Sequence, residues 1–390
     1  MFLRAAVVWV LMLVAAASLR AAPGLTAGQT AGQTAPASLP ASVLPPGSSG
    51  EDIYRLACAA CHGADGAGVP RAALGFEQPV PDFTDCQFAT GEPFPDWVAV
   101  VHEGGPIRGL DRHMPRFGDA LSVEEIERVV RYLWTFCTEP GWPRGDLNFP
   151  RPLFTEKAFP ENEAVLTTVV NGRGPKGIGN ELVYERRVGR RSQFEVILPF
   201  NIQQDSPTTG AARWNRGLGD VVLGFKHALY ASVDTGRIVS AGGEIVLPTG
   251  KESAGLGSGV TVFEPFVLAG QAIGSTGFAQ IHAALELPSD RSKASREAFV
   301  RTAVGASLLQ DRGFGRAWTP ILEVLWARPE GERSEWDLVP QMQVTLSKLQ
   351  HVAIGAGVRI PLNGRGERHP QAVTYLLWDW FDGGFLDFWR

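Results

Sequence analysis

The stretch Cys58-Ala59-Ala60-Cys61-His62 decides how the first half of this chain is interpreted. Its two cysteines are three residues apart and therefore lie on one turn of a helix, where each thiol can add to a vinyl group of haem. The histidine that follows is then placed under the iron as an axial ligand. The pattern predicts one covalently attached haem c, held by Cys58, Cys61 and His62.

A second axial ligand is expected because an iron that only transfers electrons keeps both axial positions occupied. Beyond the apolar N-terminal stretch the chain has two methionines, Met114 and Met342, and only Met114 lies in the same region as the haem motif. We expect Met114 to bind the iron, and its thioether to raise the reduction potential relative to a second histidine. The alternatives are that His102 or His113 binds instead, or that Met114 only packs.

Helical patterns flank these residues. Ser49 can cap a short helix carrying Ile53 and Leu56 on one face, and the cysteine motif follows at its end. Ser122-Val123-Glu124-Glu125 has the form of a capping box, and the next apolar residues recur at helical spacing, at Ile126, Val129, Val130 and Leu133. The sequence predicts a small α domain over residues 51–140.

This region resembles the class I, mitochondrial-type cytochromes c. The shared features are the continuation CHGxxGxG over 61–68, the pair Met114-Pro115, and a last helix that carries Tyr132-Leu133-Trp134. The resemblance implies thioether bonds at Cys58 and Cys61, a proximal ligand at His62 and a distal ligand at Met114. It also implies an electron carrier, not an enzyme, with redox proteins or small electron donors and acceptors as partners.

Two cysteines remain, Cys86 and Cys137. In an oxidising compartment leftover thiols usually pair, so we expect a disulfide between them. The alternatives are two separately buried cysteines, or a zinc site made from all four, for which the second pair lacks the usual spacing.

The N-terminal residues indicate export. An apolar run from Ala5 to Ala17 follows Arg4 and is too short to span a bilayer as a helix, so we predict a signal peptide over 1–22. Residues 23–50 lack charge and are rich in Ala, Gly, Ser and Pro, which predicts a disordered linker. Residues 51–140 carry 15 acidic residues against 7 arginines and no lysine, which argues against nucleic acid as a partner and suits a basic or neutral one.

After a proline-rich stretch over 141–161, expected to be a linker, the periodicity becomes two. Phe194, Val196, Leu198, Phe200 and Ile202 illustrate it. About twelve such segments follow, most of 9–13 residues, and the connections between them alternate between short turns and longer polar loops. This pattern predicts an antiparallel up-and-down β-barrel over 162–390, inserted in the outer membrane, with both ends of the chain on the periplasmic side.

Two glycine-rich strings support a further resemblance. Residues 217–224 and 246–250 resemble strand ends in outer-membrane transport proteins, including those linked to phenol degradation. On the polar faces of the strands we expect a set of charged residues to line the lumen, namely Glu195, Lys226, Glu244, Arg301 and Arg359.

Two other groups of residues, four arginines and three histidines, carry charge or potential metal ligands. The arginines at 186, 187, 190 and 191 cluster near a short turn. We expect them to form a solvated or headgroup-facing rim; the alternative is a docking site for the acidic haem domain. His227, His282 and His351 fall on different strands without neighbouring ligands, which argues against a metal site.

The sequence therefore predicts an α domain followed by a β-barrel: a periplasmic mono-haem cytochrome with His/Met ligation, tethered to the outer membrane. One alternative is a soluble periplasmic oxidoreductase whose β domain binds substrate and passes electrons to haem. Another is an outer-membrane transporter gated by the redox state of the haem.

Overall fold

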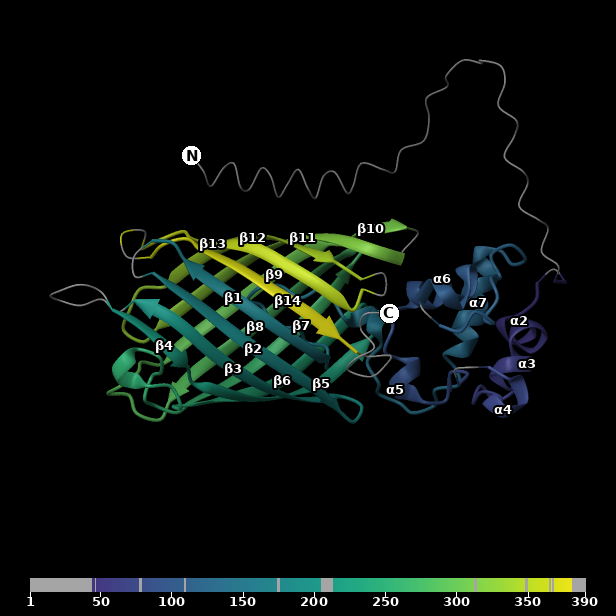
Figure 1. The fold of residues 1–390 in the computed structure, drawn as a ribbon, viewed down its shortest axis with the longest axis horizontal. Coiled ribbons are helices and arrows are strands. Elements are labelled where there is room, and N and C mark those ends of the chain that lie inside the picture. Colours follow the sequence, from purple (N-terminus) through teal and green to yellow (C-terminus); the bar gives the residue numbers. More distant parts are fainter. Residues whose placement is uncertain are drawn as a thin grey trace, which may run out of the picture. The chain divides into compact units, whose positions relative to one another are not determined.

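The computed structural model describes residues 44–45, 47–76, 79–108, 110–173, 176–204, 213–311, 314–347, 350–364, 366 and 368–380. The expected signal peptide and most of the expected linker lie outside these residues. A group of short helices precedes a large sheet (Figure 1). Among the residues that the structure describes, no helix is both long enough and apolar enough to cross a membrane.

The helical part is built around two capped helices. Helix α2 (Gly50–Ala57) starts with Ser49 and Asp52, whose side chains each bind the other's backbone N–H, and α7 (Val123–Leu133) starts with the same arrangement of Ser122 and Glu125. Both predicted helix starts are confirmed. Between them lie α3 (Ala59–His62), α4 (Arg71–Leu74), α5 (Cys86–Ala89), α6 (Phe94–Glu103) and the 3₁₀ helix η1 (Gly105–Arg108).

The contact between α2 and α7 requires glycine at position 50. A Cβ atom there would lie 2.2 Å from the backbone oxygen of Arg128, which no side chain could tolerate. The close crossing buries a core between the helices, made of Ile53, Tyr54, Phe83, Val101, Leu121, Ile126, Val129, Val130 and Leu133.

The strands are nearly all long. They are β1 (Asn162–Asn171), β2 (Gly177–Val188), β3 (Ser192–Gln204), β4 (Trp214–Leu218), β5 (Val221–Ser232), β6 (Arg237–Leu247), β7 (Val262–Ile273), β8 (Gly277–Pro288), β9 (Glu297–Ala306), β10 (Leu308–Asp311), β11 (Phe314–Pro329), β12 (Glu335–Thr345), β13 (Val352–Pro361) and β14 (Gln371–Asp379).

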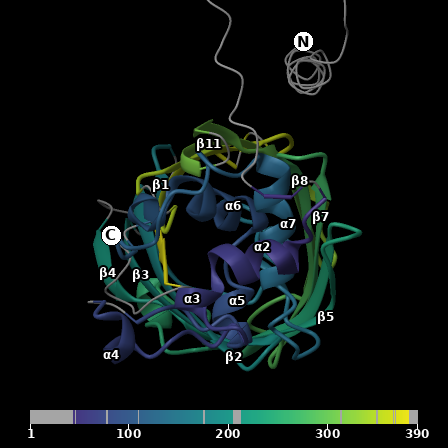
Figure 2. The same ribbon diagram turned by 90° about the vertical axis from the view of Figure 1, so that its right-hand side faces the viewer.

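The sheet closes on itself. Each strand pairs antiparallel with its neighbours, and β1 pairs with β14 from Glu163 opposite Asp379 to Asn171 opposite Gln371. Two of the 14 strands are continuations, because β4 and β5 both pair with β3, and β9 and β10 both pair with β11. The result is a closed 12-stranded antiparallel barrel, seen as a ring in Figure 2. The predicted fold class, an α domain followed by a barrel of about twelve strands, is confirmed.

The outer face of the barrel is apolar. Along β3, the side chains of Phe194, Leu198, Phe200 and Ile202 alternate with buried or half-buried ones and are 39–54% exposed. Similar exposed residues recur on the other strands, among them Leu223, Ile245, Val267, Ile281 and Leu285. A barrel with an apolar exterior and tilted strands of this length is of the outer-membrane type.

The proline-rich segment 145–161 lies inside the barrel. Its residues bond to side chains from nine strands around the ring: Glu163 of β1, Glu185 of β2, Gln193 of β3, Lys226 of β5, Ser240 of β6, Gln280 of β8, Arg301 of β9, Glu323 of β11 and Tyr375 of β14. A segment can contact all these strands of a closed ring only from within it. We call residues 145–161 the lumen segment. The sequence had led us to expect only a linker here.

Apolar residues hold the same segment. Leu147, Phe149 and Phe159 are buried in a cluster with inward-facing residues of β6 to β9 and β11, and the ring of Phe149 stacks on that of Phe278 at 5.9 Å. The lumen segment therefore fills part of the barrel interior with both apolar and polar contacts.

Candidate functional site

The CAACH motif forms a tight helical corner. Cys58 ends α2 and begins α3, and His62 is the last residue of α3. The hydroxyl of the fully buried Tyr54 donates to the carbonyl oxygens of His62 and Gly63, at 3.2 and 2.6 Å. Tyr54 thus fixes the point where the chain turns away from the motif.

A cavity with mainly apolar walls opens beside this corner. Cys58, Cys61, His62 and Met114 all line it. Its remaining walls are largely apolar, with Val80, Phe83, Phe88, Val101, Phe117 and Leu133 among them. The structure thus brings together the four residues that the sequence predicted as haem ligands.

The imidazole of His62 is held as a neutral ring. It stacks on Phe83, with ring centres 4.7 Å apart, and burial lowers the pKa of His62 to about 4. Its Nδ1 is buried and has no hydrogen-bond partner in the described part of the chain. Neutral imidazole is the form of histidine that binds a metal.

The two cysteines of the motif are half-buried, and neither is in a disulfide. Burial, together with the neighbouring Cys61, raises the pKa of the Cys58 thiol to about 12. Both sulfur atoms therefore remain available beside the cavity for a covalent attachment.

Met114 is placed by a loop folded against glycines. The N–H of Gly105 donates to the Met114 carbonyl at 3.1 Å, and a Cβ atom on Gly105 would lie 2.9 Å from that of Met114. Only glycine permits this approach, so the chain at 104–105 allows the loop to bring Met114 to the cavity wall.

The competing histidines are bound elsewhere. The Nδ1 of His113 lies 2.7 Å from a carboxylate oxygen of Asp111, and its ring stacks on Phe76 at 4.8 Å. His113 does line the cavity, with its side chain 45% exposed, whereas His102 does not, and the Nδ1 of His102 contacts Glu103 at 2.8 Å. Met114 and His113 thus line the same cavity as His62, and His102 does not.

One wall of the cavity is polar. The buried Arg108 pairs with Asp96 at 2.6 Å and with Glu92 at 3.0 Å, and all three side chains line the cavity. Trp97 lies beside them, and its buried indole Nε1 has no hydrogen-bond acceptor within the described residues. The guanidinium of Arg108 is thus already paired with two carboxylates, and the indole N–H of Trp97 is the donor on this wall that could bind an acceptor of a ligand.

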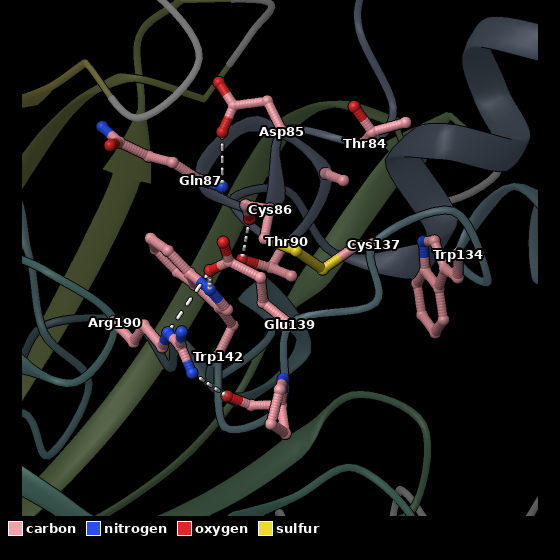
Figure 3. The surroundings of a disulfide bond; sticks show 12 residues. Thr84, Asp85, Cys86, Gln87, Thr90, Trp134, Cys137, Glu139, Trp142 and Arg190 are labelled. Carbon is pink, nitrogen blue, oxygen red and sulfur yellow. Dashed lines mark hydrogen bonds and ion pairs between the residues drawn. A yellow bond between two sulfur atoms is a disulfide. The ribbon is translucent and has the colours of Figure 1, made fainter. Parts of the chain in front are cut away.

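Cys86 and Cys137 form a disulfide, the pairing that the sequence led us to expect (Figure 3). It joins the start of α5 to the chain just after α7. Because Cys86 and Cys137 are bonded to each other, they are not available to bind zinc together with Cys58 and Cys61.

Next to the disulfide the helical part contacts the turn between β2 and β3. Arg190 lies 3.3 Å from the carboxylate of Glu139, which also accepts a hydrogen bond from Trp142 (Figure 3). Arg191 donates to the carbonyl of Gly141 at 2.7 Å. The expected solvated rim is therefore wrong for Arg187, which is buried and donates to the carbonyl of Arg190. Arg190 is exposed, and both it and Arg191 contact acceptors at the end of the helical domain.

The charged residues expected in the lumen do face inward. Lys226 donates to the carbonyl of Lys157 at 2.7 Å and Arg301 to that of Phe154 at 3.1 Å, while Arg359 pairs with Asp337 at 2.6 Å. Glu195 is buried and Glu244 half-buried on the same face. Much of this polar surface is occupied by the lumen segment.

Sequence reasoning missed the residues that hold the lumen segment. The carboxylate of Glu323 accepts hydrogen bonds from the backbone N–H groups of Leu153, Phe154 and Thr155, at 2.7–3.2 Å. One signal was present: phenylalanines recur at 149, 154 and 159, which is unusual in a linker that has no core to join.

Comparison with known proteins identifies the helical part. Residues 45–133 match the family model described as cytochrome c oxidase, cbb3-type, subunit III. A curated relative, the cbb3-type cytochrome c oxidase subunit FixP of Sinorhizobium medicae, is 28% identical over 102 residues, which is 25% of this chain and 32% of that protein. The chain thus spans about a third of the relative's length. Residues 45–133 are a cytochrome c domain, as the sequence had suggested.

Solved structures similar to the barrel include an outer membrane channel from Pseudomonas putida F1, with a TM-score of 0.41 and 12% identity, covering 60% of this chain and all of that one. The KdgM porin has a TM-score of 0.37 and 7% identity, covering 56% of this chain and 99% of its own.

Proposed function

We propose that this chain is a mono-haem cytochrome c held at the outer membrane by its own barrel. One observation carries the proposal: both motif cysteines, His62 and Met114 line a single, largely apolar cavity. Two thiols, a neutral imidazole and a thioether are the groups needed to attach haem c and to bind its iron from both sides.

The residues of the cavity fit this group. Cys58 and Cys61 would hold it covalently, and His62 and Met114 would bind the metal. The buried N–H of Trp97, which has no acceptor among the described residues, would bind one of its carboxylates. When bound, haem supplies a one-electron couple between ferric and ferrous iron. The surrounding apolar side chains exclude water, and the stacked Phe83 fixes the plane of the His62 ring.

The barrel supports a position in the outer membrane. Its exposed apolar face matches the lipid core, and outer-membrane barrels have short turns on the periplasmic side and longer loops outside. The cytochrome domain contacts the turn at 189–191, one of the short ones, through Arg190 and Arg191. This contact supports a periplasmic position for the cytochrome domain.

The test uses the full chain expressed in a Gram-negative host that matures c-type cytochromes. Haem should stay with the polypeptide after denaturing electrophoresis, and it should be lost in a Cys58→Ser, Cys61→Ser double variant. A Cys86→Ser, Cys137→Ser variant is the matched control and should keep its haem. Absence of haem from the wild-type chain would refute the proposal.

Location is tested on the same material. The chain should fractionate with outer membranes, require detergent for extraction and migrate differently on gels before and after heating. Full solubility without detergent would favour a soluble periplasmic oxidoreductase instead.

A second candidate function, redox-gated transport, is favoured by the lumen segment, which runs directly from the cytochrome domain into the barrel interior. Conductance of the reconstituted protein in planar bilayers, measured in oxidised and reduced states, tests it. Equal conductance in the two states would exclude gating.

A further inference from the structure

The haem cavity adjoins another cavity. A second cavity lies where the cytochrome domain meets the barrel, and Glu92 and Asp96 line both. From the barrel side its walls include His351, just before β13, and Asp379, the last residue of β14. Two carboxylates of the cytochrome domain thus stand between the haem cavity and the barrel interior.

A continuous series of charged side chains connects the two cavities. Arg108, on the haem side, contacts Glu92 at 3.0 Å. The same oxygen of Glu92 lies 3.9 Å from Nε2 of His351, and Nδ1 of His351 pairs with the carboxylate of Asp379. Arg108 and His351 are buried.

The other charged groups around the second cavity are paired with groups of opposite charge. Arg151 contacts Glu163 and Glu185, and Lys157 contacts Glu161 and Glu163. Asp96 is paired with Arg108. His351 differs from all of these, because its ordinary pKa lies close to neutrality and it sits between two carboxylates, those of Glu92 and Asp379.

An added electron changes the field in this region. Reduction of an iron in the haem cavity removes one positive charge from a low-dielectric site lined by Arg108 and Glu92, and buried charges interact strongly. Loss of that positive charge removes a repulsion, so a positive charge on His351, between Glu92 and Asp379, becomes more favourable. This coupling has a direct physical route through Glu92.

We propose that His351 is a redox-linked proton acceptor that couples the haem site to the periplasmic end of the barrel. The inference rests on the proposed function, since it requires haem in the first cavity. A one-electron donor, either a redox protein or a small reductant, reduces ferric to ferrous iron. One proton from bulk water, reaching the second cavity, binds the imidazole of His351. On reoxidation the electron and the proton both leave.

The experiment is a redox titration of the full-length haem protein in detergent, followed by haem absorbance, from pH 5 to pH 9. For one proton taken up per electron, each tenfold fall in proton concentration lowers the midpoint potential by up to about 59 mV. The midpoint potential of the wild type should fall with rising pH over part of this range. His351→Asn should abolish this dependence of the midpoint potential on pH. Glu92→Gln should weaken the dependence, because it removes the charge that lies between Arg108 and His351.

The control is His227→Asn. His227 bonds Ser192 on the barrel and lines neither cavity, so its loss should leave the pH dependence unchanged. Folding is checked by heat-modifiable migration, and His351→Gln replaces the Asn variant if the latter does not fold.

Two results would overturn the inference: a potential independent of pH in the wild type, or an undiminished slope in the His351 variants. Failure of the proposed function would be seen in a different measurement, as the absence of haem from the chain on a denaturing gel.

Discussion

Glu323 of β11 accepts hydrogen bonds from both the backbone N–H and the hydroxyl of Thr155, at 2.7 and 2.6 Å. The same buried carboxylate accepts hydrogen bonds from the backbone N–H groups of Leu153 and Phe154, and from the side-chain amide of Gln341 on the barrel wall. It therefore supplies the acceptor for three successive backbone N–H groups of the lumen segment. Four donor groups of the lumen segment thus bond to one side chain of the barrel wall.

Glu323→Ala should therefore destabilise the protein. Three backbone N–H groups lose their acceptor inside the barrel, and each such group costs roughly 1–3 kcal/mol when buried. We expect a loss of about 3 kcal/mol or more, measured by guanidinium unfolding in detergent, and faster protease cleavage within 145–161. Glu323→Gln, which keeps one acceptor oxygen, should lose less.

Glu286→Ala is the matched control, since it removes a lumen-facing carboxylate from β8 without touching the lumen segment's attachment at Glu323. If the Glu286 and Glu323 variants lose the same free energy of unfolding, the hydrogen bonds at Glu323 make no specific contribution to stability.

Met114→Ala should leave haem attached and change its ligation. The cysteines are untouched, so haem remains on the polypeptide after denaturation. The near-infrared absorption of a sulfur-bound ferric iron should disappear, and the reduction potential should fall as another ligand replaces the thioether. Met342→Ala, which changes an exposed residue on β12, serves as the control. An unaltered spectrum in the Met114 variant would assign the sixth ligand to another residue.

Opening the disulfide should weaken the cytochrome domain. Cys86 and Cys137 are separated by 51 residues, and closing a loop of that length stabilises a fold by about 4 kcal/mol in the chain-entropy model. The double variant Cys86→Ser, Cys137→Ser should lose stability of this order, followed by haem absorbance during denaturation. Wild-type protein treated with reductant should behave in the same way, and an unchanged midpoint under reductant would show that the bond contributes nothing.

Asp52 gives a pH-dependent contribution at the start of α2. Hydrogen bonds from the Ser49 side chain and then from the Ser49 backbone N–H lower the pKa of Asp52 below its usual 3.8. A lowered pKa in the folded state means that the ionised carboxylate stabilises the fold above about pH 4, and that this contribution is lost as pH falls through the folded-state pKa.

The stability difference between wild type and Asp52→Asn should therefore be largest near neutral pH and shrink below pH 4. Unfolding curves of both proteins at pH 7, 5 and 3 measure it. A difference that stays constant over this range would show that the charge of Asp52 has no part in capping.

Much of the fold is visible in the sequence because its determinants are local. The capping pairs Ser49/Asp52 and Ser122/Glu125 lie within one helical turn, and the alternation along β3 reports directly which side chains face outward. Loop lengths give the up-and-down order of the strands. These features need no knowledge of distant contacts.

The rest depends on residues far apart in the chain. Nothing near Glu323 indicates that its partners are Leu153 to Thr155, and nothing near His351 indicates Glu92. The arginines at 190 and 191 lie in a charged turn, and the sequence around them does not show that acceptors at 139–141, some 50 residues earlier, contact them. Such pairs are set by tertiary structure and not by local pattern.

The lumen segment also bears on how the chain is assembled. It precedes β1, yet it bonds to strands from both ends of the sequence, Glu163 of β1 and Tyr375 of β14, the two that form the closing seam. Both strands of the closing seam therefore contact the segment that the barrel encloses. Because the cytochrome c domain, the lumen segment and the barrel belong to one chain, each barrel carries a cytochrome c domain joined directly to the segment that its own wall encloses.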